Sequence, residues 1–124
     1  MTRYLTTAEL IEINAEMVRL FGGIHGVRDQ AALESAAGRL QSGYYADEIE
    51  EAAALFESLS QNHPFLDGNK RTAITAAGVF LLMNGITTRF DDLEAYHWLI
   101  GLYESGDVRK PVIEAWLRAH TGPL

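Results

Sequence analysis

Residues 62–83 read NHPFLDGNKRTAITAAGVFLLM, and this stretch decides how the chain is organised. Its second half, from Ala73 to Met83, is apolar nearly all round, which is typical of a helix at the centre of a bundle. Its first half holds a histidine, a carboxylate, a glycine turn and two adjacent cations within nine residues. Pro64 disfavours helical geometry at His63, so a preceding helix should end there. The stretch predicts a loop that leads directly into a buried helix.

A loop of this composition at a helix N-terminus is typical of a phosphate site, because free backbone N–H groups and the helix dipole attract anions. Lys70 and Arg71 stand in the first turn, where basic residues oppose the dipole and lower stability unless an anion is present. Gly68 lets the backbone approach a phosphate closely. His63 can accept a proton from a hydroxyl, and Asp67 can hold a magnesium ion. The sequence therefore predicts phosphate-centred chemistry.

Each of these residues also has a plainer interpretation. Asp67-Gly68 is a common turn dipeptide, and Asn69 could be no more than the N-cap of the following helix. A lone histidine at a helix end is more often a capping or half-buried side chain than a catalyst. The two interpretations are compatible, because a turn and a cap are what expose the N–H groups.

Helical spacing of apolar residues predicts a bundle around residues 69–84. Thr6 and Glu9 form a capping box before the first helix, and Asp29 is placed to cap the second. Residues 86–90 should be short and extended, with at most a small hairpin near the loops. We expect an all-α fold in one domain over residues 1–124, with helices over residues 10–21, 29–40, 48–61, 69–84, 91–105 and 111–117.

Composition narrows the function classes. Ten Lys and Arg against 17 Asp and Glu give a net charge of -7, which argues against broad electrostatic binding of nucleic acid. Cysteine is absent, so the sequence has no disulfide framework and no thiolate metal site. The N-terminus lacks a signal-peptide core, and no apolar run approaches the ~18 residues of a membrane span. We therefore expect a cytoplasmic protein that contacts no membrane.

Residues 63–71 resemble the core motif of the Fic/Doc superfamily, H-x-F-x-D/E-G/A-N-x-x-R or K-R. Residues 26–36 resemble the loop and helix near the start of such proteins, and residues 80–85 resemble the end of their central helix. The length also fits the compact form of the Doc (death-on-curing) toxins of type II toxin–antitoxin modules. The resemblance implies a compact Fic/Doc-type bundle of about six helices around a central apolar helix.

Two departures from the Fic adenylyltransferase pattern favour the Doc branch. Lys70 stands where that pattern has a second glycine, and Ile74 stands where it has a last arginine. Both changes weaken the case for AMP transfer. The Doc branch is understood to transfer the terminal phosphate of ATP, and the implied target is a threonine of translation elongation factor Tu.

The resemblance also implies a role for each motif residue, with ATP as the substrate and Mg²⁺ as the metal. His63 takes the proton from the target hydroxyl, Asp67 holds the metal, and Phe65 packs in the core. The phosphates are bound by the Gly68 backbone together with Asn69, Lys70 and Arg71.

Regulation is indicated by an absent motif. Self-inhibited Fic proteins carry S/T-x-x-x-E-G/N, and no glutamate of this sequence fits it. The hypothesis is an antitoxin from another chain, laid as a helix into a groove of the bundle. Two alternatives stay open: AMP transfer, which Gly68 favours because some Doc motifs have alanine there, and a catalytically silent antitoxin-binding module.

Overall fold

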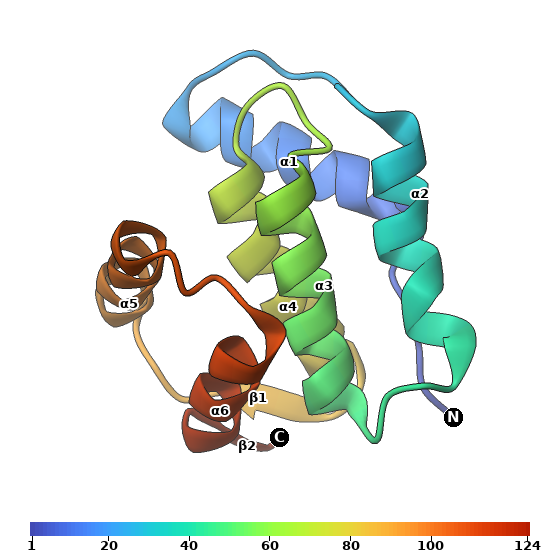
Figure 1. Cartoon of the computed structure of the whole chain (residues 1–124), viewed down its shortest axis with the longest axis vertical. Helices are drawn as coiled ribbons and strands as arrows, with labels where there is room; N and C mark the ends of the chain where they lie inside the picture. The colour runs from blue at the N-terminus through green and yellow to red at the C-terminus, as the bar shows by residue number, and fades with distance from the viewer.

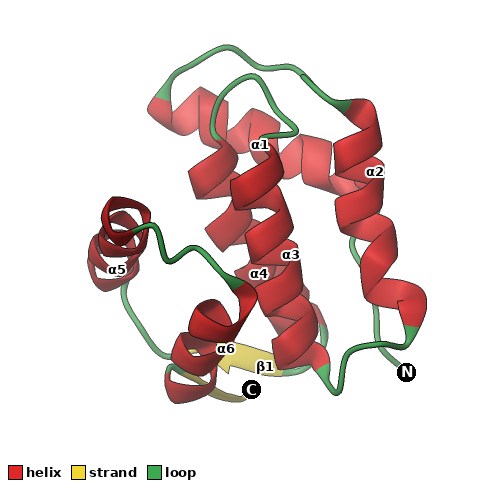
Figure 2. Cartoon of the chain, viewed as in Figure 1, coloured by secondary structure: helices red, strands yellow, loops and turns green.

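The computed structural model describes residues 1–124 except the side chain of Asp92. The chain forms six α-helices and one small sheet (Figures 1 and 2). A 3₁₀ turn, Arg39–Ser42, follows α2, and the sheet has two strands, β1 (Ile86–Thr88) and β2 (Thr121–Pro123). The all-α prediction is confirmed. The helices are α1 (Thr7–Phe21), α2 (Gln30–Gly38), α3 (Glu48–Asn62), α4 (Asn69–Met83), α5 (Asp92–Ser105) and α6 (Lys110–Ala119).

Local sequence signals set where the helices begin. The Thr6 hydroxyl accepts from the Glu9 N–H at 3.1 Å, and the Glu9 carboxylate accepts from the Thr6 N–H at 2.9 Å. This is the predicted capping box, which satisfies two N–H groups that lack helical partners. Asp29 caps α2 as predicted, and Asp47 and Asp91 cap α3 and α5 in the same way.

Helix α4 lies at the centre of the bundle, beside α3 and in contact with α1 and β1 (Figure 1). Both α3 and α4 bury alanines, whose short side chains let two helices approach closely. Phe56 of α3 and Phe80 of α4 are among the largest fully buried side chains. Phe65 is also fully buried, so it anchors the motif loop in the core as predicted.

One face of α4 departs from the expectation of a helix buried all round. Val79 is 36% exposed and Leu82 is 51% exposed. Both side chains line a groove whose walls come from α1, α4 and α5. In Figure 1, α5 stands apart from the α3–α4 pair. An apolar helix face can be covered by its own chain or left open, and the residue pattern is the same in both cases.

The small sheet is not the expected hairpin. Strands β1 and β2 pair antiparallel, with Ile86 opposite Pro123 and Thr88 opposite Thr121. They are separated by α5 and α6, so the pairing joins the last residues of the chain to the segment after α4. Among the helices described, none has the length and apolar character needed to cross a membrane.

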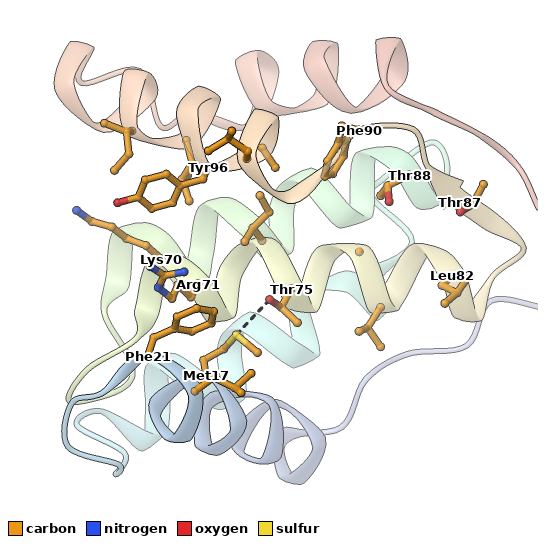
Figure 3. A pocket seen from close by; sticks show the side chains of 18 residues that line it. Met17, Phe21, Lys70, Arg71, Thr75, Leu82, Thr87, Thr88, Phe90 and Tyr96 are labelled. Atoms are coloured by element: carbon orange, nitrogen blue, oxygen red, sulfur yellow. Dashed lines mark hydrogen bonds between the residues drawn. The ribbon is translucent and has the colours of Figure 1, made fainter.

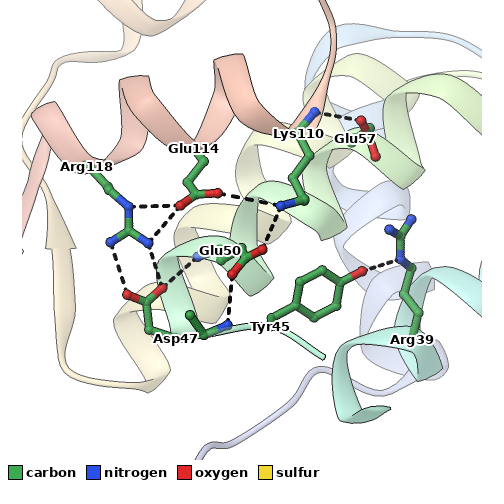
Figure 4. Close-up of polar contacts among 9 residues, drawn as sticks. Arg39, Tyr45, Asp47, Glu50, Glu57, Lys110, Glu114 and Arg118 are labelled. Carbon is green, nitrogen blue, oxygen red and sulfur yellow. Dashed lines mark hydrogen bonds and ion pairs between the residues drawn. The ribbon is translucent and has the colours of Figure 1, made fainter. Parts of the chain in front are cut away.

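Charged side chains hold α6 against the start of α3 (Figure 4). We call Asp47, Glu50, Lys110, Glu114 and Arg118 the α3–α6 charge cluster. Lys110 Nζ lies 2.7 Å from Glu50 Oε2, and Arg118 bonds both Asp47 oxygens at 3.0 and 3.1 Å. Glu114 pairs with both cations. The Arg118 guanidinium lowers the pKa of Asp47, and the Glu50 carboxylate raises the pKa of Lys110.

Candidate active site

The motif residues form the loop between α3 and α4, and His63 ends α3 as Pro64 predicted. His63 has φ 45° and ψ 59°, and it is the one non-glycine residue with positive φ in the part of the chain described. This left-handed region costs an ordinary residue about 1–2 kcal/mol. The His63 side chain is exposed to solvent. The backbone therefore takes an unfavourable conformation that leaves the imidazole accessible.

A cleft of about 410 Å³ lies at this loop. Its wall includes the end of α1, the glycine-rich segment after it, and the start of α4. The cleft brings together all six residues that the sequence singled out: His63, Asp67, Gly68, Asn69, Lys70 and Arg71.

The Asp67-Gly68 turn is fixed by the glycine-rich segment. Asp67 Oδ2 accepts a hydrogen bond from the Ile24 backbone N–H at 2.8 Å. A Cβ at Gly23 would lie 2.9 Å from Asp67 Cβ, so only glycine allows this approach. Gly68 takes φ 78° at the N-cap position of α4. One carboxylate oxygen of Asp67 is thus bound to the backbone, and the other has no hydrogen-bond partner among the described groups.

Asn69 is not the N-cap of α4, because Gly68 occupies that position and makes no side-chain bond. The Asn69 side chain turns back to the loop instead. Its Oδ1 accepts from the Phe65 N–H and its Nδ2 donates to the Phe65 carbonyl, both at 3.0 Å. The Asn69 amide therefore shapes the loop. What it can offer a phosphate is its backbone N–H in the first helical turn, which has no partner within the helix.

Lys70 and Arg71 lie against aromatic rings. Lys70 Nζ is 4.3 Å from the ring centre of Tyr103, and burial raises the pKa of that phenol. Arg71 Cζ is 3.7 Å from the ring centre of Phe21 and 5.4 Å from that of Tyr96. Among the described side chains, no carboxylate forms an ion pair with either cation. Cation–π contacts orient the two charges without neutralising them.

Sequence reasoning missed Asn14, a fully buried residue of α1. Its Nδ2 donates to the Asp67 carbonyl at 2.8 Å and to Thr72 Oγ1 at 3.1 Å. Thr72 is also fully buried, so the pair ties the turn to the core. A signal was present, since Asn14 falls four residues after Leu10 on the apolar stripe of the first helix. A buried amide nearly always has hydrogen-bond partners, which points to a positioning role.

The donor set of the cleft fits a magnesium ion only if phosphate oxygens complete the shell. The described residues contain no group of three or more His, Asp or Glu side chains that could hold a metal by themselves. Mg²⁺ is usually bound by one or two carboxylates together with substrate phosphates and water. The unbonded oxygen of Asp67 can supply that one carboxylate contact.

Comparison with known proteins gives the family. The Fic/DOC family matches residues 4–81, which include the whole motif loop. Toxin Doc of Mycolicibacterium smegmatis is 38% identical over 96 residues, covering 73% of this chain and 72% of the relative. Protein kinase doc of Escherichia phage P1 is 32% identical over 103 residues, covering 80% of this chain and 81% of the relative. The chain therefore belongs to the Fic/Doc family, and these two relatives support its place among the Doc toxins.

Proposed function

We propose that this protein is a Doc-type toxin that transfers the terminal phosphate of ATP to a threonine hydroxyl of elongation factor Tu and so arrests translation. The observation that carries the proposal is the pair Lys70 and Arg71 at a helix N-terminus. These two cations have no carboxylate partner among the described side chains, and they line the same cleft as His63. The name of the phage relative, a protein kinase, points to the same chemistry.

In this reaction His63 accepts the proton of the attacking threonine hydroxyl. The threonine oxygen forms a bond to the γ-phosphorus, the bond from the γ-phosphorus to the bridging oxygen breaks, and ADP leaves with that oxygen. The first-turn N–H groups of α4, with Lys70 and Arg71, hold the phosphates and oppose their charge. Positioning and charge stabilisation supply most of the catalysis in phosphoryl transfer.

Asp67 would hold magnesium through the carboxylate oxygen that the backbone does not use. When bound, magnesium neutralises charge on the phosphate oxygens. The hydrogen bond from the Ile24 N–H holds the Asp67 side chain at the wall of the cleft.

The positions of Ile74 and Lys70 favour phosphate transfer over AMP transfer. Ile74, where the adenylyltransferase pattern has its last arginine, lines the apolar groove and is not part of the wall of the phosphate cleft. Position 74 therefore offers no cation for a further phosphate. Lys70 also occupies space that a glycine would leave open to a phosphate group. AMP transfer remains the second candidate.

The deciding experiment supplies elongation factor Tu, magnesium and ATP labelled on either the α or the γ phosphate. We expect label from the γ position on the target. Label from the α position alone would overturn the proposal. His63→Ala should abolish transfer, whereas His97→Ala, on an exposed position of α5, should keep it.

One relative is named Toxin Doc, and the resemblance to toxins of toxin–antitoxin modules makes an antitoxin the expected partner. We propose that its inhibitory helix lies in the groove of about 940 Å³ formed by α1, α4 and α5 (Figure 3). Apolar side chains such as Val79 and Leu82 suit the apolar face of an amphipathic helix. The groove and the phosphate cleft share Phe21, Lys70 and Arg71. An occupant of the groove would therefore reach the phosphate-binding cations.

A further inference from the structure

The unusual backbone at His63 must be held by something outside the histidine itself. A glycine at this position would end α3 without strain. The chain instead places an imidazole there, at φ 45°, beside the phosphate cleft. Unfavourable backbone conformations persist only where neighbouring groups enforce them, and they gather at functional sites. The neighbour that enforces this one is therefore part of how the site is built.

We propose that Arg28 is the positioning residue for His63, holding its main chain so that the imidazole faces the cleft. Arg28 Nε donates to the His63 carbonyl at 2.6 Å, and Nη2 donates to the Asn62 carbonyl at 2.7 Å. These two carbonyls belong to the peptide units on either side of the His63 Cα. One guanidinium therefore fixes both peptide planes, and with them φ and ψ of His63.

Backbone hydrogen bonds around Arg28 also attach this segment to the motif loop. The N–H groups of Arg28 and Asp29 both donate to the Pro64 carbonyl, at 2.7 and 3.1 Å. The Leu66 N–H donates to the Gly26 carbonyl at 2.9 Å. Residues 26–29 thus run alongside residues 62–66, and the Arg28 side chain extends this contact to the end of α3.

Charge makes Arg28 well suited to this place. The last carbonyls of a helix lack helical partners and carry the negative end of its dipole, which favours a cation. Helix α3 has no basic residue in its own last turn, so the cation comes from the segment after α1. Two charge-assisted hydrogen bonds from a rigid fork hold geometry better than the single point charge of a lysine.

This inference rests on the proposed role of His63 as proton acceptor, and its test separates that role from mere stability. Arg28→Gln should lower kcat by about 10- to 100-fold, because a small displacement of a catalytic group has effects of this size. Affinity for magnesium–ATP, measured by calorimetry, should stay within about twofold, because the phosphates contact α4. The kcat of Arg28→Lys should lie between the kcat of Arg28→Gln and that of wild type.

The matched control is Arg19→Gln, an exposed arginine whose side-chain partner is Glu16. Both kcat and affinity should match wild type in this variant. An unchanged kcat in Arg28→Gln would overturn the inference. So would equal losses of kcat and ATP affinity in both Arg28 variants, which would indicate general loss of structure. Should Arg28→Gln fail to fold, Arg28→Lys decides: a kcat equal to wild type would overturn the inference.

A second readout does not depend on the reaction. In imidazole NMR spectra, Arg28→Gln should shift or broaden the His63 signals more than those of His25, His97 and His120. If wild-type protein transfers no phosphate from ATP, the proposed function fails, yet this spectral change would still support the positioning role. Unchanged His63 signals in Arg28→Gln would overturn it.

Discussion

Lys70 and Lys110 both stand in the first turn of a helix, where a positive charge opposes the dipole, but their surroundings differ. Lys110, at the start of α6, contacts the carboxylates of Glu50 at 2.7 Å and Glu114 at 3.6 Å. Lys70, at the start of α4, lies over the ring of Tyr103 and has no carboxylate partner among the described side chains.

The arginines repeat this difference. Arg118 pairs with Asp47 and Glu114 in the α3–α6 charge cluster (Figure 4). Arg71 lies at one end of the groove, between the rings of Phe21 and Tyr96 (Figure 3). Cations that hold two helices together are neutralised within the chain. Cations that are oriented but left without a counter-charge are available to an anion from outside.

The largest expected effect comes from replacing one arginine from each region by glutamine and comparing the two variants. Arg71→Gln should lower the rate of phosphate transfer by about 10²–10³-fold, the usual cost of removing one transition-state contact to developing charge. Arg118→Gln should leave the rate unchanged, because its partners are structural. Steady-state transfer of γ-label measures both variants. If both variants lost the same fraction of the transfer rate, the absence of a carboxylate partner would not distinguish functional cations from structural ones.

The next effect concerns the groove that begins at Arg71. Leu82→Glu should weaken antitoxin binding by about 30-fold or more, because a charge would be buried within an apolar contact. The free toxin should keep its transfer rate. Leu124→Glu, at an exposed position outside the groove, is the matched control. Unchanged antitoxin affinity in Leu82→Glu, measured by titration calorimetry, would place the antitoxin on another surface.

A smaller effect tests how Asn14 stabilises the Asp67-Gly68 turn. Asn14→Leu should lower the free energy of unfolding by about 1–3 kcal/mol, because the Asp67 carbonyl and the Thr72 hydroxyl lose their donor. The loss should be similar in low and high salt, since these bonds are between neutral groups. Urea denaturation measures it, with the exposed Glu12→Gln as control. A loss that disappears in high salt would contradict this account of the turn.

The smallest effect tests the α3–α6 charge cluster. Asp47→Asn keeps a capping side chain but removes the charge, so it should lower the free energy of unfolding by about 0.5–1 kcal/mol at neutral pH. Arg118 lowers the pKa of Asp47, so this stabilisation is present above the unfolded-state pKa and is lost as pH falls through the folded-state pKa. Denaturation at a pH below the folded-state pKa of Asp47 should show little difference in stability between variant and wild type. An equal loss at both pH values would contradict the ion-pair explanation.

Much of the fold could be predicted because its signals are local. The Thr6–Glu9 box, the Asp29 cap and the Pro64 break each act within a few residues. The motif residues are also neighbours in sequence, so a single loop had to bring them together. Residue chemistry predicted a proton acceptor, a metal ligand and an anion site, and the family resemblance added ATP and the target protein.

The remaining features depend on contacts between distant segments. Asn14 reaches Asp67 across 53 residues, and Arg28 reaches His63 across 35. Neither contact has a spacing that sequence patterns can reveal. The plainer interpretation of Asn69 as the N-cap of the helix is wrong, because Gly68 takes that position. The open face of α4 was missed because an apolar residue looks the same in a sequence whether its own chain or a partner covers it.

The central claim is that the start of α4 grips the phosphates of ATP with cations the chain leaves without a counter-charge. Titration calorimetry of magnesium–ATP into wild type, Arg71→Gln and Arg118→Gln tests it most directly. We predict saturable binding to wild type and Arg118→Gln, and binding lost or greatly weakened in Arg71→Gln. Equal binding by all three proteins, or no uptake of ATP by wild type, would contradict the claim.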